Sequence, residues 1–245
     1  MELAKLHRKR LWLTVLLVLG FESLWIVAIL NVSLSREMSA PLTMGFPIGQ
    51  ASQVHAMFAP VLATVVVSRL AAMEHDGGMM PVLFAANQSR GSLFLAKFAV
   101  AVAISTVATG LVVLAVSLVA ASQGVPSDPG LLTVWLLGLM LANLAIIAIQ
   151  LVLALLFQRQ AVTLTVGIIG GLMGSFAGFV PTGIAMLIPW QYPGLVSPVR
   201  MEQTDGAITG FPVVDHLAAL IALVAVVGIA FMALGRFVFS RRISR

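Results

Sequence analysis

The sequence predicts an all-α membrane protein with six transmembrane helices, and three observations lead to that class. Of the 245 residues, 60% are hydrophobic and 9% are charged, with a mean hydropathy of +1.07. A soluble globular chain carries charge on about a quarter of its residues. Apolar runs long enough to cross a bilayer alternate with polar or proline-rich connections. Basic residues gather before the first run and after the last, as membrane topology favours.

The predicted spans belong to a single domain over residues 1–245. A basic amphipathic helix over residues 1–10 precedes them. The first run is long and no small-x-small cleavage site follows it, so we predict an uncleaved span rather than a signal peptide. Pro60 interrupts the second span. The six spans cover residues 11–30, 50–70, 93–121, 131–157, 161–180 and 213–235.

The placement of lysine and arginine predicts the orientation of these spans. All of them except Arg36 and Arg200 fall on one side of the predicted membrane. By the positive-inside rule that side is cytoplasmic, and six spans place both termini there. The chain has no cysteine, which excludes disulfides and thiolate metal sites.

No pattern in the sequence supports catalysis, a metal site or nucleic-acid binding. The four histidines lack the paired spacing of a zinc site, and no lysine stands in a phosphate-binding loop. The high pI of 10.8 comes from basic residues at topology-setting positions rather than from a nucleic-acid-binding stripe. If ATP drives this protein, another chain hydrolyses it. The histidines are His7, His55, His75 and His216.

Three polar residues inside the spans are candidates for a substrate path. Glu22 is the one carboxylate well inside a span, and an ionisable group there costs about 2.5–3.5 kcal/mol on insertion scales. It either faces a polar partner or cavity, or lies near one leaflet and meets water. Asn143 and Gln150 are seven residues apart and share a helix face. They either line a pathway or hold helices together by hydrogen bonds.

Span 161–180 contains a ladder of small residues. Small residues let helix backbones approach closely, and van der Waals contact drives helix association in lipid. The ladder predicts a subunit interface, with packing inside one bundle as the alternative. Its glycines are Gly167, Gly170, Gly171, Gly174 and Gly178.

The connection between the second and third spans is long and charged, unlike a simple turn. Gly77 and Gly78 end the helix that arrives from Glu74, and Pro81 suits the first turn of a new helix. We interpret the loop over residues 71–92 as a docking element for a soluble partner.

This connection resembles that of the membrane subunits of type-2 ATP-binding-cassette exporters. Met79 replaces the usual threonine of that family, and Asn87 stands where proline is common. The resemblance implies a cytoplasmic coupling helix that docks on the ATPase. The residues that match the family spacing are Glu74, Asp76, Gly78, Leu83, Arg90 and Lys97.

The same resemblance implies the partners of the chain. Two ATP-binding-cassette ATPase subunits would bind ATP and Mg, with no cofactor in this chain. A second permease subunit, identical or paralogous, would complete the transporter in a bacterial cytoplasmic membrane. The only other partner implied is the lipid bilayer.

Two further segments resemble the lantibiotic-immunity branch of these exporters: Glu2-x-x-Lys5-x-x-Arg8 and the stretch 188–193. The branch implies an amphiphilic antimicrobial peptide as cargo. Export of a lipid, glycan or drug-like amphiphile is the alternative within transport, and a non-transporting scaffold or sensor is the alternative outside it.

Five prolines divide residues 181–212 into pieces too short to cross a membrane. Exposed backbone groups cannot face hydrocarbon, so we predict short re-entrant or interfacial helices. Trp190 and Tyr192 would lie at the headgroup level. The segment would form either a lid for an amphiphilic substrate or a seal over the outer end of the bundle.

Overall fold

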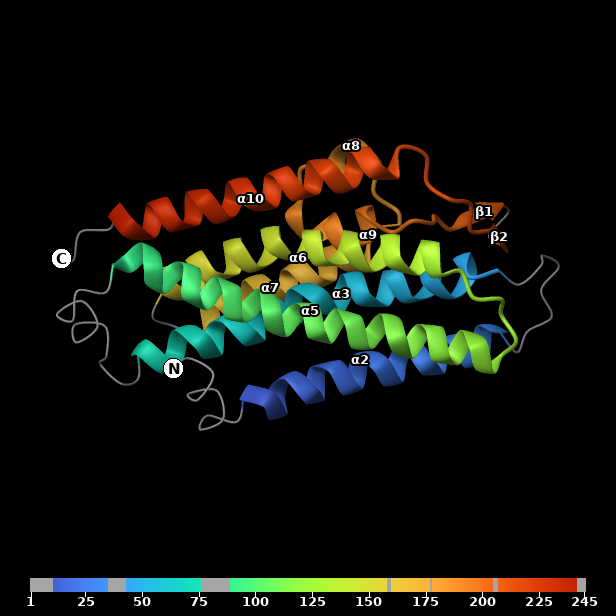
Figure 1. The fold of residues 1–245 in the computed structure, drawn as a ribbon, viewed down its shortest axis with the longest axis horizontal. Helices are drawn as coiled ribbons and strands as arrows, with labels where there is room; N and C mark the ends of the chain where they lie inside the picture. Colours follow the sequence, from blue (N-terminus) through green and yellow to red (C-terminus); the bar gives the residue numbers. More distant parts are fainter. Residues whose placement is uncertain are drawn as a thin grey trace.

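The computed structural model describes residues 11–34, 43–75, 89–157, 160–176, 178–204 and 207–241. Within these ranges six longer helices run side by side (Figure 1). They are α2 (Leu11–Leu34), α3 (Gly45–His75), α5 (Arg90–Ser122), α6 (Pro129–Leu156), α7 (Gln160–Ser175) and α10 (Leu217–Arg241). Shorter elements separate α7 from α10. They are α8 (Thr182–Ala185), the 3₁₀ helix η1 (Pro189–Gln191), α9 (Tyr192–Leu195), β1 (Glu202–Thr204) and β2 (Ala207–Gly210).

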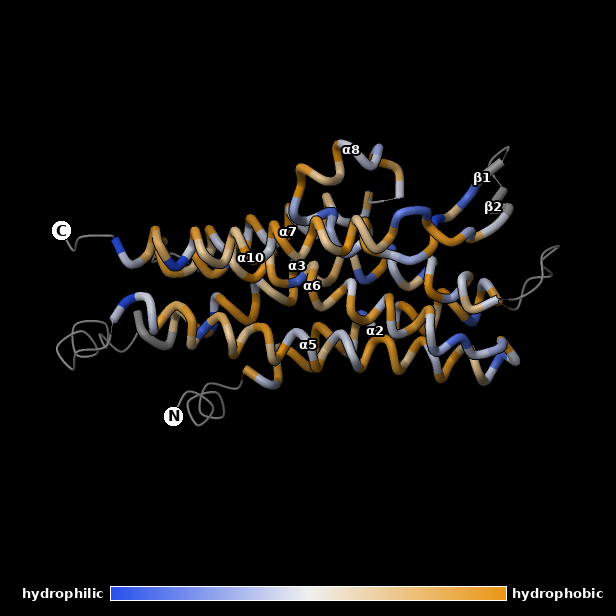
Figure 2. Tube along the Cα trace, turned by 45° about the horizontal axis from the view of Figure 1, so that its top comes forward, coloured by the Kyte–Doolittle hydropathy of each residue, from blue (hydrophilic) through white to orange (hydrophobic). Residues whose placement is uncertain are grey.

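The long helices bury one shared hydrophobic core, with α3 and α6 at its centre. α3 packs against α7, α6, α2 and α5, while α6 also packs against α10. α2 and α10 lie at the edges and leave most of their apolar side chains exposed. Figure 2 shows hydrophobic residues along most of the length of these helices. Such an extensive apolar exterior is typical of a chain surrounded by lipid.

The predicted helical class is confirmed, while the count of six spans is not. Five of the described helices are long and apolar enough to cross a membrane: α2, α3, α5, α6 and α10. The predicted span 161–180 corresponds to α7, which has only 16 residues. At 1.5 Å per residue α7 is about 24 Å long, shorter than the hydrocarbon core of about 30 Å. Beyond Ser175 the chain forms turns instead of a further helical turn.

Pro60 does not interrupt α3, contrary to the prediction. Proline has no N–H, so the carbonyl of Ala56, four residues earlier, loses its donor within the helix. Gly174 of α7 packs on this carbonyl so closely that a Cβ there would overlap its oxygen. A neighbouring helix therefore shields the freed carbonyl, and burial within protein is one way in which membrane helices tolerate an internal proline.

Two helix starts are fixed by side-chain caps. The Ser89 hydroxyl accepts a hydrogen bond from the Ser92 N–H (3.1 Å) at the start of α5. The Asp128 carboxylate accepts one from the Leu131 N–H (2.9 Å), and Pro129 occupies the first turn of α6. Each cap satisfies one of the N–H groups that a helix start leaves without an intrahelical partner.

The short elements after α7 fold back against the bundle rather than standing away from it. α9 and η1 contact α3, α6 and α7. The hairpin of β1 and β2 was not predicted. All other secondary-structure elements of the described residues are helices. Val213 pairs with Val199, and His216 has a positive φ of 58°, so α10 begins at Leu217 rather than at residue 213.

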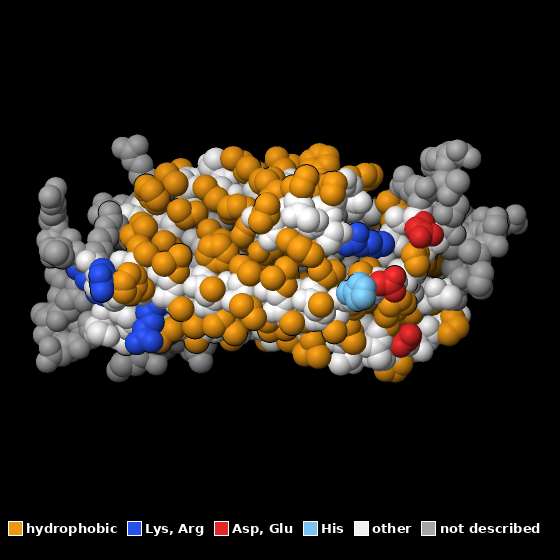
Figure 3. Space-filling view, turned by 90° about the horizontal axis from the view of Figure 1, so that it is seen from above, with side chains coloured by type: hydrophobic (Ala, Val, Ile, Leu, Met, Phe, Trp, Pro, Cys, Tyr) orange, Lys and Arg blue, Asp and Glu red, His pale blue; other side chains and the backbone are white. Residues whose placement is uncertain are grey.

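Apart from the buried Glu22, the charged side chains of the described residues divide between the two ends of the bundle (Figure 3). We call the end where α3 finishes and α5 begins the basic end, and the opposite end the acidic end. Arg69, Arg90, Lys97, Arg236 and Arg241 belong to the helical segments nearest the basic end. Asp128, Arg200, Glu202 and Asp215 belong to the connections at the acidic end.

Candidate functional site

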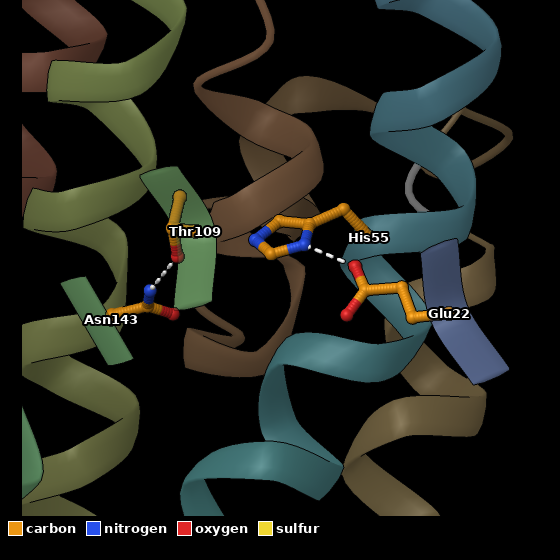
Figure 4. A network of polar contacts seen from close by, with 4 residues as sticks. All are labelled: Glu22, His55, Thr109 and Asn143. Carbon is orange, nitrogen blue, oxygen red and sulfur yellow. Dashed lines mark hydrogen bonds and ion pairs between the residues drawn. The ribbon is translucent and has the colours of Figure 1, made fainter. Parts of the chain in front are cut away.

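A buried acid–imidazole pair joins α2 to α3 in the middle of the bundle. Glu22 is fully buried and His55 is 1% exposed. A hydrogen bond of 2.5 Å links Glu22 Oε1 to His55 Nδ1 (Figure 4). Glu22 Oε2 and His55 Nε2 are also buried, and neither has a hydrogen-bond partner among the described residues. The pair therefore has capacity for further polar contacts.

Glu22 faces inward because it lies on the buried stripe of α2. The stripe contains Leu19, Glu22, Ile26 and Leu30 at helical spacing. Glu22 is the twelfth of 24 residues in the helix, so its carboxyl group is far from both ends. Glu22 therefore has a polar partner on a neighbouring helix, as one of the two interpretations expects.

Thr109 and Asn143 bring two more helices to the same level. The Asn143 amide donates to the Thr109 hydroxyl (3.2 Å), which links α6 to α5. Figure 4 shows His55 with its free nitrogen directed toward this second pair. We call Glu22, His55, Thr109 and Asn143 the polar layer. Asn143 thus holds helices together, which is one of the two predicted roles.

Gln150, predicted to share a face with Asn143, is fully buried on α6. Neither its amide nitrogen nor its amide oxygen has a hydrogen-bond partner among the described residues. An unpaired buried amide costs roughly 1–3 kcal/mol in proteins. No contact joins Gln150 to the polar layer in the part of the chain described.

An apolar groove of about 450 Å³ opens between α2 and α5 on the basic side of the polar layer. Its α2 wall includes Leu11, Val15 and Leu19, the last of which is one turn before Glu22. Its α5 wall includes Ala108, the neighbour of Thr109. Side chains of this kind fit an alkyl or aromatic group of drug-like size. The residues along the groove are Leu11, Trp12, Val15, Leu16, Leu19, Ala103, Ile104, Val107, Ala108 and Leu111.

A smaller cavity of about 80 Å³ lies on the acidic side of the polar layer. Ser52 borders it, one helical turn before His55 on the same face of α3. The Ser52 hydroxyl is hydrogen-bonded to Ser197 (2.9 Å), and Gln53, Thr182 and Arg200 complete the polar part of the lining. The polar layer therefore lies between an apolar groove and a partly polar cavity.

The glycine ladder of α7 faces α3 of the same chain. A Cβ at Gly167 would overlap Thr64, and one at Gly171 would press on the Met57 carbonyl. A Cβ at Gly170 would overlap the Trp190 ring. Gly178 lies beyond α7 and is exposed. This face is occupied within the bundle and is not open to a second subunit, so the predicted interface gives way here to the packing alternative.

Trp190 and Tyr192 pack into the bundle rather than forming an exposed lid. Tyr192 is 2% exposed, and its hydroxyl donates to the Met186 carbonyl (3.0 Å). Trp190 fills the space left by Gly170 and Gly174. The headgroup-level position of Tyr192 stays a prediction, and its side chain packs inside the bundle.

The structure describes only some of the predicted coupling residues. Asp76, Gly78 and Leu83 lie outside the described residues. Glu74 belongs to the last turn of α3. Arg90 is the first residue of α5 and is half-buried.

Lys97, the remaining coupling candidate, is fully buried, and its Nζ donates to the Leu70 carbonyl (2.8 Å). This bond ties α5 to α3 on the protein side of the loop. A buried lysine does not reach a soluble partner directly, and this one holds together the two helices that flank the loop.

His55 is the functional candidate that sequence reasoning missed. The histidines were judged only by zinc spacing, and no three His, Asp or Glu side chains of the described residues gather at one point. The sequence feature that could have indicated His55 is the occurrence of polar residues within an otherwise apolar helix. Ser52, His55 and Ser68 share the α3 sequence with long apolar runs, and each is buried.

The family model described as ABC-2 family transporter protein matches residues 1–174. The match covers α2, α3, α5, α6 and nearly all of α7, and therefore every residue of the polar layer. No curated protein matches the chain.

Proposed function

Because the chain belongs to the ABC-2 family of transporter proteins, we propose that it moves an amphiphilic molecule across the membrane as the permease half of an exporter. ABC-2 permeases are membrane transport components that work with an ATPase partner. The observation behind the amphiphilic substrate is the apolar groove that leads to the polar layer. Such a site offers separate surroundings to the apolar and polar parts of one molecule.

The proposed assembly contains two ATPase subunits, which bind ATP and Mg, and a second permease, identical or paralogous. The chain forms a single permease domain. The basic end faces the cytoplasm of a bacterial cell, in accord with the positive-inside rule. α7 and the inward-folded segment after it together provide the sixth crossing.

We further propose an antimicrobial peptide of the lantibiotic type as cargo. Support comes from the amphiphilic character of such peptides and from the sequence resemblance of residues 188–193. Export of a lipid, glycan or drug-like amphiphile is the second candidate, because the groove is lined by apolar side chains alone.

A groove-filling substitution tests the proposed function. Ala103 is exposed on the α5 wall, so Ala103→Trp fills the groove without adding volume to the core. We expect cells expressing this variant to lose protection against the peptide. Leu114→Trp is the matched control, since Leu114 is exposed on the same helix outside the groove.

Equal protection by both variants at equal expression would remove the groove from the substrate path. Loss of export of a lipid or drug-like probe, with peptide protection unchanged, would select the second candidate. Absence of any ATPase in the purified complex would favour a scaffold or sensor.

The loop over residues 71–92 is proposed to couple the spans to ATP hydrolysis. Glu74→Ala and Arg90→Ala are each expected to reduce transport about tenfold, within the range typical of coupling free energies. ATP hydrolysis and membrane insertion should persist, because both positions lie at the helix ends that form the two sides of this loop. The measurement is transport and ATP turnover in the reconstituted complex.

Arg241→Ala is the control for this experiment. Arg241 also lies at the basic end, but its guanidinium stacks over Phe237 of its own helix (4.2 Å). Normal transport by the Glu74 and Arg90 variants would show that the docking assignment is wrong.

A further inference from the structure

The inner end of the groove lies next to the polar layer, because Leu19 is one helical turn before Glu22 and Ala108 is the neighbour of Thr109. On α2, Leu11, Val15 and Leu19 follow the same buried stripe as Glu22. At 1.5 Å per residue, Leu11 and Glu22 are about 16 Å apart along the helix axis. A molecule lying in the groove would therefore have one end at the basic side and the other beside Glu22.

The α5 wall becomes polar at the same level. Ile104 and Ala108 border the groove, while Ser105 and Thr109 follow them on the neighbouring stripe. The Ser105 hydroxyl is buried without a hydrogen-bond partner among the described residues. Ser105 and Glu22 Oε2 thus leave unmet hydrogen-bonding capacity close to the inner end of the groove.

The ionisable acid nearest the inner end of the groove is Glu22. Facing the pair are the neutral Thr109 of α5 and Asn143 of α6, and α3 contributes His55. Lys97, the nearest basic residue on α5, lies twelve positions before Thr109 and is bonded to Leu70. An anionic head would meet a carboxyl group here, whereas a cationic head would meet an opposite charge.

We propose that the groove binds a single-chain amphiphile with a cationic head, and that Glu22 Oε2 receives that head. This inference rests on the proposed function, because it assigns a substrate class to the same groove. The alkyl chain lies along Leu11, Val15 and Leu19, and the head occupies the polar layer.

Binding of dodecyltrimethylammonium and of dodecanol to the full-length protein in nanodiscs tests the proposal. We expect the cation to bind at least about tenfold tighter, the ratio that 1.4 kcal/mol gives. The comparison of the two probes is made on the unmodified protein and does not depend on any variant folding.

Variants separate this inference from the proposed function. Glu22→Gln should bind both probes equally, while Asp215→Asn, an exposed acid of the acidic end, should keep the preference for the cation. Equal binding of the two probes to the unmodified protein, or a cation preference retained in Glu22→Gln, would overturn the role of Glu22 and leave the groove intact. Binding of neither probe would overturn the groove itself, as expected if a second copy of this chain covers it.

Discussion

Replacing His55 with leucine is expected to destabilise the protein strongly. The substitution leaves Glu22 fully buried without its one observed partner. Leaving a buried polar group without its hydrogen-bond partner costs about 1–3 kcal/mol. The measurement is the free energy of unfolding of the purified protein in mixed micelles, from a denaturing-detergent titration.

The double variant Glu22→Leu/His55→Leu provides the control. It removes both polar groups and keeps apolar volume at both positions, so its stability should return close to that of the unmodified protein. Cation binding should stay lost. A single variant as stable as the unmodified protein would mean that the pair contributes nothing to the contact between α2 and α3.

Gly174→Ala is expected to produce the second large effect. The new methyl group would overlap the carbonyl oxygen of Ala56, which Pro60 has left without a helical donor. Backbone cannot move aside as a side-chain tip can, so the loss should lie at the upper end of the roughly 1–3 kcal/mol that overpacking costs. Thermal unfolding in detergent measures it.

Gly110→Ala is the matched control within an apolar helix. A Cβ at Gly110 of α5 meets no atom within 4 Å. Alanine is the better helix former by about 0.5–1 kcal/mol, so this variant should be as stable as the unmodified protein or more stable. Equal stability of the two variants would contradict the close packing of α3 on α7.

The spans were predictable because the signal that defines them is local. Apolar runs of sufficient length located α2, α3, α5, α6 and α10 to within several residues at most ends. The run over 161–180 predicted a longer helix than α7, because the last residues of the run are apolar but fold as turns around Gly178. Hydropathy reports the preference for lipid and does not report where the backbone leaves a helix.

The site was only half predictable, because its chemistry depends on pairs between helices. Glu22 was identified from its cost in lipid, but its partner lies 33 residues away on another helix. The rotation of α2 relative to α3 decides that pairing, and hydrophobicity on all sides of a membrane helix leaves rotation undetermined. The glycines of α7 were recognised as a close-approach surface, while the helix that approaches them was not.

Pro60 divides α3 into two segments that can bend relative to each other, although the helix is continuous. The missing hydrogen bond makes this the point where the helix bends most easily. His55 and Ser52 lie in the segment before it, and Leu70, held by Lys97, lies in the segment that leads to the loop. A displacement at the basic end therefore reaches the middle of the membrane as a change of bend angle. Bending at Pro60 would move His55 and the Ala56 carbonyl together, while the segment nearer the loop stays hydrogen-bonded to α5 through Leu70 and Lys97.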